Sequence, residues 1–213
     1  MTTLTKFTHS CVRLDDGDHS LVIDPGIFSE LSAALDGADE VLITHEHPDH
    51  VDVDRVRIAV SADPRLRIWA PPKLAAALDV GDQVVAVTPG ERFEAAGFDV
   101  EVFGGQHGLL HPTVPVVQNN CYLINETVYH PGDSVIVPTK PVRLLLLPIH
   151  APWSSTADAM DFVVSVRPPK AIQIHDALLN RYGLSFVEAH VARISGEHGI
   201  EYTHVDAAST VEL

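Results

Sequence analysis

The chain has few cysteines and no long apolar run. Cys11 and Cys121 are the only two cysteines among 213 residues. So small a number excludes a framework built from disulfides, and we expect both to be reduced thiols in a cytoplasmic protein. The most apolar run, 142–149, contains Arg143 and Pro148 and is far shorter than the ~18 apolar residues that span a membrane. The N-terminus alternates polar and apolar residues and lacks the apolar segment of a signal peptide.

Basic residues are also scarce. Lys and Arg number 14 against 29 Asp and Glu, and the formal net charge is −15. Phosphate backbones and anionic lipid surfaces are bound by basic faces. We therefore expect neither nucleic acid nor a membrane as a partner, and a small-molecule substrate instead. Oligomeric state has no signature in this sequence.

The composition is that of a globular protein, with 46% hydrophobic and 20% charged residues. The length suits one domain and no stretch resembles a linker, so we predict a single domain over 1–213. The spacing of apolar residues predicts many strands with helices between them. Predicted strands are 4–14 and 20–24 (a hairpin), 40–44, 66–70, 83–87, 91–103 (a hairpin), 121–125, 127–130, 142–147, 171–174 and 201–205. Predicted helices are 29–35, 52–60, 72–78, 156–166 and 185–194.

Histidine is abundant, with 13 residues, and three of them lie in one short segment. Residues 44–50 read Thr-His-Glu-His-Pro-Asp-His directly after a predicted strand, which is the pattern H-x-H-x-D-H. The zinc-protease pattern H-E-x-x-H would need a histidine at position 49, and Pro48 opposes a continuous helix. A solvated polar loop that caps the next helix is the alternative without a metal.

The spacing of this segment favours metal binding. In an extended loop His45 and His47 lie on one side and can share one metal ion. Asp49 and His50, where the chain enters the next helix, can reach a second ion nearby. Imidazole and carboxylate ligands without thiolate suit Zn²⁺, Mn²⁺ or iron and leave positions open for water.

Five motifs follow one another along the chain. They are DPG (24–26), THEHPDH (44–50), His107 after a predicted strand, HPGDS (130–134) and IHD (174–176). In content and order they resemble the metallo-β-lactamase fold superfamily of metal-dependent hydrolases. Their form is most similar to the branch that includes ascorbate-6-phosphate lactonase-like proteins.

The resemblance implies a fold of the α/β (α+β) class, a four-layer αββα sandwich. In it two mixed β-sheets pack face to face, helices cover the outside, and metal ions bind at one edge. It also implies a third histidine on the first ion, an aspartate that bridges both ions, and a late histidine on the second. Either His107 or His111 can be the third histidine, and we favour His107 because it follows a strand end sooner. Asp133 fits the bridging position and His175 the last one.

The implied function is metal-dependent hydrolysis. Two divalent ions, most naturally Zn²⁺ with Mn²⁺ or iron as alternatives, would hold a bridging hydroxide that attacks a small ester, lactone or phosphoester. Asp49 and Asp133 would be the catalytic carboxylates. An iron-containing redox or non-hydrolytic metalloprotein of the same fold is the alternative, although the chain carries no electron-carrier module. A binding module whose metals only stabilise the fold is a third interpretation.

Five further residues could line the site or hold its ligands in place. Asp24 is expected to fix the metal-binding loop or one of its histidines, with an ordinary turn aspartate as the alternative. His9 either points into the site or is a strand histidine without a role there. His111, if it is not a ligand, would lie at the rim. His150 and Trp153 either line the pocket or belong to the scaffold.

Overall fold

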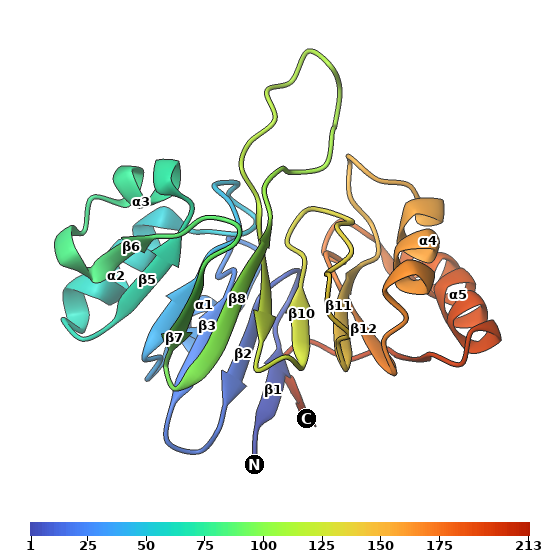
Figure 1. Cartoon of the computed structure of the whole chain (residues 1–213), viewed down its shortest axis with the longest axis horizontal. Helices are drawn as coiled ribbons and strands as arrows, with labels where there is room; N and C mark the ends of the chain where they lie inside the picture. Colours follow the sequence, from blue (N-terminus) through green and yellow to red (C-terminus); the bar gives the residue numbers. More distant parts are fainter.

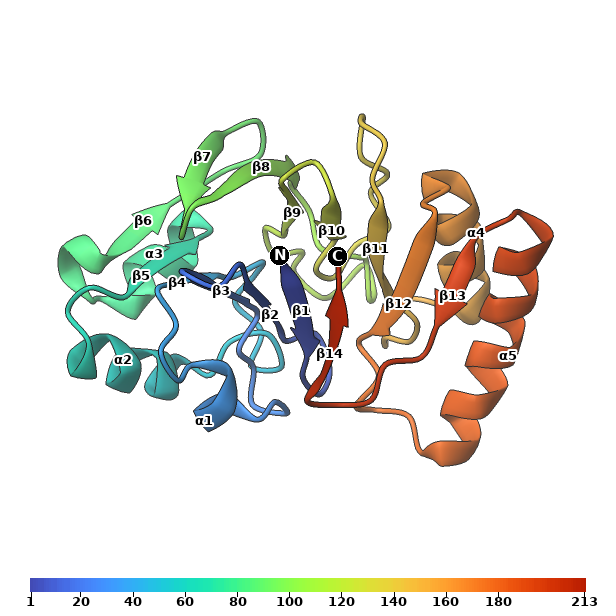
Figure 2. The same cartoon turned by 90° about the horizontal axis from the view of Figure 1, so that it is seen from below.

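The computed structural model describes residues 1–213 as two β-sheets packed face to face, with helices on both outer sides (Figure 1, Figure 2). The first sheet has seven strands, antiparallel from β14 to β3 and parallel from β3 to β6. In spatial order they are β14 (Ser209–Glu212), β1 (Thr3–Lys6), β2 (Val12–Asp15), β3 (Ser20–Ile23), β4 (Glu40–Leu42), β5 (Arg67–Ala70) and β6 (Val84–Ala86).

The second sheet also has seven strands, parallel from β13 to β10 and antiparallel from β10 to β7. In spatial order they are β13 (Glu201–Thr203), β12 (Lys170–Ile174), β11 (Leu144–Pro148), β10 (Val128–His130), β9 (Asn120–Ile124), β8 (Phe98–Gly104) and β7 (Arg92–Ala95). Both sheets are therefore mixed, as the resemblance implies.

Helices cover the outer face of each sheet. On the first sheet lie α1 (Leu31–Ala34), α2 (Val53–Ala62) and α3 (Pro72–Leu78), with a 3₁₀ turn, η1 (Gly81–Gln83), before β6. On the second lie α4 (Thr156–Val166) and α5 (Arg181–Glu197). The helix α4 begins at a capping box in which the Ser155 hydroxyl accepts from the Asp158 N–H and the Asp158 carboxylate accepts from the Ser155 N–H. None of the helices combines the length and apolar character that a membrane-spanning segment needs.

Three apolar clusters fill the spaces between the four layers. One lies between the sheets, and one lies between each sheet and its helices. In β11, Leu144 and Leu146 belong to the central cluster, whereas Leu145 and Leu147 pack on the helix side. The continuous apolar run at this strand is therefore explained by burial on both faces. These layers confirm the predicted αββα sandwich.

Two predicted elements differ clearly from the structure, and one strand was missed. The segment 4–14 is not one strand, because the Phe7 N–H bonds to the Cys11 carbonyl at 2.8 Å and His9 has a φ of 69°, so a loop separates β1 from β2. The strand β14 was not predicted. The last helix is longer than 185–194, since the Asn180 side chain accepts from two backbone N–H groups and starts α5 at residue 181.

Candidate metal centre

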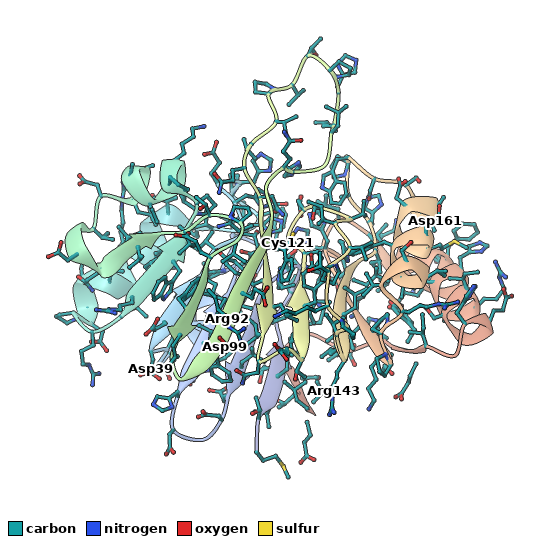
Figure 3. The ribbon with its side chains drawn as sticks, viewed as in Figure 1. Asp39, Arg92, Asp99, Cys121, Arg143 and Asp161 are labelled. Carbon is teal, nitrogen blue, oxygen red and sulfur yellow. The ribbon has the colours of Figure 1, made fainter.

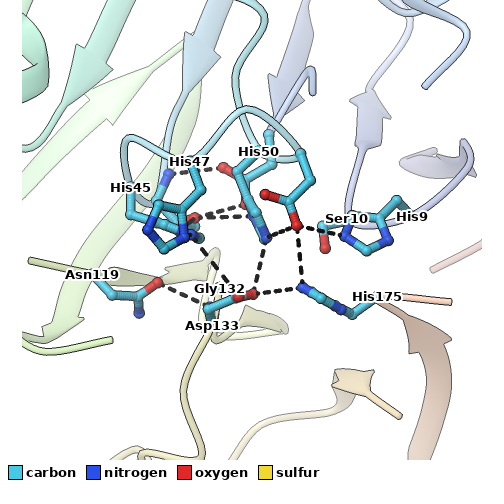
Figure 4. Close-up of polar contacts among 12 residues, drawn as sticks. His9, Ser10, His45, His47, His50, Asn119, Gly132, Asp133 and His175 are labelled. Carbon is cyan, nitrogen blue, oxygen red and sulfur yellow. Dashed lines mark hydrogen bonds and ion pairs between the residues drawn. The ribbon is translucent and has the colours of Figure 1, made fainter. Parts of the chain in front are cut away.

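The histidines and aspartates of the five motifs meet at one edge of the sandwich, beyond strand ends of both sheets (Figure 4). From the first sheet, β4 leads into the segment 44–50. From the second sheet, β8 leads to His107, β10 to Asp133 and β12 to His175. Because parallel strands end at the same edge of a sheet, residues far apart along the chain become neighbours there.

The first group of candidate ligands consists of His45, His47, His107 and Asp133, whose ligand atoms all lie within 4.8 Å of one another. His45 Nε2 lies 3.1 Å from His47 Nδ1, and His107 Nε2 lies 3.1 Å from Asp133 Oδ2. Three imidazole nitrogens and one carboxylate oxygen thus face a common point. This donor set suits a divalent transition-metal ion.

The second group consists of His9, Asp49, His50 and His175, again with all ligand atoms within 4.8 Å. The Nε2 atoms of His50 and His175 lie 3.9 and 3.6 Å from Asp49 Oδ2. The same two atoms lie 2.9 and 3.1 Å from Asp133 Oδ1. Asp133 therefore turns one oxygen, Oδ2, toward the first group and the other, Oδ1, toward the second.

Hydrogen bonds on the far side of three rings determine which nitrogen faces the cluster. The Nδ1 atoms of His107 and His175 each donate to a backbone carbonyl, at 2.7 and 2.6 Å. His50 Nδ1 donates to Asp24 Oδ2 at 2.6 Å. In each ring Nδ1 keeps a proton and Nε2 is left to face the cluster. Outer partners of this kind orient metal-ligating histidines.

His9 belongs to the second group by distance, but its hydrogen bonds differ from those of the other histidines. Its Nδ1 accepts from the Ala177 N–H at 3.3 Å, so the proton of the neutral ring lies on Nε2. Nε2 then donates to Asp49 Oδ2, 3.1 Å away. The structure therefore brings His9 into the site as a donor to Asp49, not as a nitrogen with a free lone pair.

Asp24, directly after β3, lies beneath the metal-binding loop and is fully buried. Its carboxylate accepts from the Thr44 N–H at 2.8 Å, from the Thr44 hydroxyl at 2.7 Å and from His50 Nδ1 at 2.6 Å. The Thr44 hydroxyl in turn accepts from His45 Nδ1 at 3.0 Å, because its own proton goes to Asp24. One carboxylate thus orients a histidine in each group.

Asn119 and Gly132 position Asp133. The Asn119 amide oxygen accepts from the Asp133 N–H at 2.9 Å, and its amide nitrogen donates to the Pro131 carbonyl at 2.9 Å. Gly132 has a φ of +56° and lies so close to Asn119 and Thr44 that a Cβ there would overlap both. Sequence reasoning missed Asn119 and the role of Thr44. The only available signal for Asn119 was a pair of asparagines just before a strand.

Opposite charges are packed together at the centre of the site. Burial raises the pKa of Asp133, but the imidazoles of His50 and His175 outweigh it and hold this pKa well below its ordinary value. Burial lowers the pKa of His50, but the carboxylates of Asp133 and Asp24 outweigh it and raise this pKa well above the usual range. Burial also raises the pKa of Asp49, while the hydrogen bond from His9 and the charge on His50 bring it down to about 2. Two ionised carboxylates therefore make the cluster attract positive charge.

Three buried polar atoms in the cluster have no hydrogen-bond partner: His50 Nε2, Asp133 Oδ1 and His175 Nε2. Such atoms are rare, because each has lost contact with water without replacing it. Here all three converge, with Asp133 Oδ1 lying 2.9 and 3.1 Å from the two nitrogens. A divalent cation would ligate all three, so the residues present fit a metal ion.

Of the two histidines considered for the first group, the structure brings His107 into the cluster and leaves His111 outside it. His111 is exposed on the loop between β8 and β9. There its Nδ1 is hydrogen-bonded to the Thr113 hydroxyl at 2.7 Å.

Trp153 and His150 both lie beside the cluster. The Trp153 indole N–H donates to Asp133 Oδ2 at 2.7 Å, so this half-buried ring borders the first group. His150 follows β11, and its backbone carbonyl receives the bond from His175 Nδ1 at 2.6 Å. The contact of Trp153 with Asp133 could not be read from the sequence, in which the two residues are 20 positions apart.

Comparisons with known proteins agree with this fold. Residues 3–175 match the family model described as the beta-lactamase superfamily domain. Protein Rv0786c of Mycobacterium tuberculosis is 37% identical over 181 residues, which cover 83% of this chain and 84% of that protein. A UPF0173 metal-dependent hydrolase of Xanthobacter autotrophicus is 30% identical over 167 residues, covering 70% and 68%. The solved structure of Igni18, a metallo hydrolase of Ignicoccus hospitalis, superposes with a TM-score of 0.77 at 19% identity, covering 99% of this chain and 97% of that chain.

Proposed function

We propose that this chain, which belongs to the beta-lactamase superfamily of metal-dependent hydrolases, binds two divalent metal ions in its histidine and aspartate cluster and hydrolyses a small ester, lactone or phosphoester. Bound there, the ions would lower the pKa of a water molecule to about 7 and polarise the bond under attack. Zn²⁺ is the first candidate, with Mn²⁺ or iron as alternatives, because the donors are imidazoles and carboxylates.

The proposed ligands divide between the two ions along the two groups. His45, His47 and His107 would hold one ion. Asp49, His50 and His175 would hold the other. Asp133 would offer one oxygen to each. The observation that carries the proposal is the convergence of three buried, unpartnered atoms on the side of Asp133 that faces the second group.

The remaining groups of the site keep these ligands in place. His9 Nε2 donates to Asp49 Oδ2 and so holds this oxygen toward His50 and His175. The low pKa values of Asp49 and Asp133 keep both carboxylates ionised at neutral pH, the state in which carboxylates bind cations. No serine or cysteine nucleophile is needed, and both cysteines are buried and free. Free thiols are also in keeping with the proposed cytoplasmic location.

Hydrolysis is favoured over the iron-containing redox alternative. The Xanthobacter relative is described as a metal-dependent hydrolase and covers more than two thirds of this chain. His47 and Trp153 are half-buried, so part of the cluster reaches the surface at this edge of the sandwich.

The test is a substrate panel of esters, lactones and phosphoesters, run on protein reconstituted separately with Zn²⁺, Mn²⁺ and Fe²⁺. We expect metal-dependent turnover that is lost in His45→Ala. The matched control is His190→Ala, which removes a histidine from the outer helix α5. A metal-loaded protein that hydrolyses nothing in the panel, and whose iron form shows an absorbance that changes on reduction, would favour the redox alternative.

A further inference from the structure

The segments that form the metal edge contain no lysine and no arginine. These segments are 7–11, 24–30, 45–52, 105–119, 131–137, 149–155 and 175–180. The rest of the connection after β10 carries Arg143 and Lys140, which pairs with Glu101 at 2.5 Å. The same segments contain seven acidic residues, namely Asp24, Glu30, Glu46, Asp49, Asp52, Asp133 and Asp176. An anionic substrate would therefore find no lysine or arginine on these segments.

Three of the basic residues that flank these segments have a partner. Lys6 is buried and donates to Asp176 at 2.8 Å, Lys73 pairs with Glu46 at 2.5 Å, and Arg181 lies over the ring of the next residue at 4.5 Å. Arg55, in the first turn of α2, is the exception. It lines a separate hollow beside the first sheet with Ile27, Glu30 and Asp52.

Other basic residues gather at the opposite edge of the sandwich. Arg143 and Lys170 lie where β11 and β12 begin, and both line a cavity of about 660 Å³ there. Since the metal cluster lies where the parallel strands end, this cavity is a whole strand length away from it. Figure 3 shows Arg92 and Arg143 in the lower part of the molecule, away from the long loop 105–119 that stands above the metal edge.

Exposed apolar side chains stand where basic ones are missing. Ile27 and Phe28 follow β3, Leu109 and Leu110 lie on the loop after β8, and Leu178 follows β12. These five residues are 40–57% exposed. We refer to them as the apolar rim.

Contacts tie the apolar rim to the metal cluster. The Phe28 ring meets the His9 ring edge-on, with centroids 5.3 Å apart. The Ile27 N–H donates to a carbonyl of the metal-binding loop at 2.9 Å. Just before Leu109, the Gly108 N–H donates to the Asp133 carbonyl at 2.7 Å. Parts of the apolar rim on two loops are therefore in contact with residues of the metal cluster or directly follow such residues.

The loop 105–119 carries the most exposed part of the rim. It contains no charged residue and rises from the body of the molecule above the metal edge (Figure 1). At its base Gly108 lies against the Trp153 ring so closely that a Cβ would overlap it. Trp153 thus joins the base of this loop to the first ligand group, where its indole N–H bonds to Asp133.

Building on the proposed function, we infer that the substrate is a neutral ester or lactone with an apolar chain, held by the apolar rim with its carbonyl at the metal cluster. A phosphoester would meet no lysine or arginine on the segments that form the metal edge, whereas an apolar chain would cover exposed leucines. In this hydrolysis the water oxygen bonds to the acyl carbon and the bond between the acyl carbon and the alcohol oxygen breaks. One proton of the water ends on the alcohol, and the other is released as the acid becomes a carboxylate.

The test compares 4-nitrophenyl esters, which share one leaving group, on metal-loaded protein. Acetate, butyrate and octanoate esters vary the apolar chain, and each methylene group that becomes buried raises kcat/KM by up to about fourfold. We expect at least a tenfold rise from butyrate to octanoate, mainly through KM. The hemisuccinate ester differs from the pentanoate ester chiefly by a terminal carboxylate, and we expect it to be at least tenfold poorer.

The variant Leu109→Ser/Leu110→Ser should reduce the ratio of kcat/KM for octanoate to that for acetate. The control Ile58→Ser removes an equally exposed apolar residue from the outer helix α2 and should leave this ratio unchanged. Metal content is measured for both, so that a lost ion is not mistaken for a changed specificity.

Several results would overturn the inference. If kcat/KM did not change with chain length, or were equal for the hemisuccinate and the pentanoate, the inferred substrate class would be wrong. The proposed hydrolase activity would not be contradicted. A dimer in sedimentation that Leu109→Ser/Leu110→Ser dissociates, without a change in the ratio, would make the rim a contact between two copies. Absence of any hydrolysis by the loaded protein would instead defeat the proposed function, and the inference with it.

Discussion

Replacing Asp24 by asparagine tests whether one buried carboxylate outside the ligand set controls metal affinity. Asparagine has nearly the same size, and it tolerates the positive φ of 52° at this position better than most residues. The change removes the charge and turns one acceptor oxygen into a donor. An N–H of the new amide then opposes either a Thr44 donor or His50 Nδ1–H, both of which bond to Asp24 at 2.6–2.8 Å.

The size of the effect follows from these contacts. A hydrogen bond to a charged group contributes about 1.5–3 kcal/mol, which corresponds to about 10- to 100-fold in a binding constant. Loss of an outer partner of a metal-binding histidine costs a similar factor. Because the bond to His50 is direct and the one to His45 passes through Thr44, we expect Asp24→Asn to weaken the second ion by this factor and the first ion less.

The assay is a Zn²⁺ titration against a chromophoric chelator, with circular dichroism to show that the variant is folded. The matched control is Asp39→Asn. Asp39 accepts from the Ser20 N–H at 2.8 Å at the start of β3, whereas Asp24 follows the end of β3. Unchanged affinity for both ions in folded Asp24→Asn would refute the reasoning. So would an equal loss in the control, because the effect would then come from general destabilisation.

Four further predictions concern the cluster itself. Fully loaded protein should hold two ions per chain by elemental analysis, and a single ion would contradict the proposed arrangement. His107→Ala should lose the ion of the first group and all turnover, whereas His111→Ala should keep its metal and change mainly KM; the opposite pattern would exchange their roles. Asp133→Asn should weaken the second ion most, lower kcat at neutral pH and move the pH–rate profile to higher pH, and two ions with an unshifted profile would remove Asp133 from the site. Metal affinity should fall as the pH is lowered through the pKa of His50, which Asp133 and Asp24 raise above its usual range, because a proton on Nε2 competes with the ion; metal titrations over a series of pH values measure this, and an affinity that does not change with pH would contradict the assignment.

The sequence predicted those parts of the site that lie close together along the chain. The pattern in 44–50 is local, so its spacing alone indicates two neighbouring positions for metal ions. The four-layer arrangement of the fold was predicted only from the family resemblance that the five motifs carry. The predicted strand 4–14 was wrong because Phe7 and Cys11, in the loop between β1 and β2, are apolar and as deeply buried as strand residues. The strand β14 was missed because it is a half-exposed edge strand whose pairing with β1 spans almost the whole chain.

Contacts between distant segments account for the remaining omissions. Lys6 looks like an outward-facing residue of the first strand, yet it is buried and bonded to Asp176, 170 positions away. Asn119 carries no motif, and its contact with Asp133 depends on how β9 pairs with β10. The direction of the His9 hydrogen bonds depends on the Ala177 N–H, which only the packing of one sheet on the other brings near. None of these contacts produces a periodic pattern or a characteristic residue spacing in the sequence.

The division of the ligands between the sheets has a consequence for how metal binding relates to folding. His45, His47, Asp49 and His50 come from the first sheet, whereas His107, Asp133 and His175 come from the second. Bound ions would therefore link the sheets, but contacts other than metal bonds already do so at this edge. The pair of Lys6 with Asp176 and the bond from the His175 N–H to the His9 carbonyl, at 3.2 Å, both cross between them. With the outer nitrogens of three rings held as well, the ligands are arranged before the ions arrive. Metal binding then orders little of the chain, so little of the binding free energy is lost to ordering and the affinity is higher. Bound metal also stabilises the folded protein by mass action.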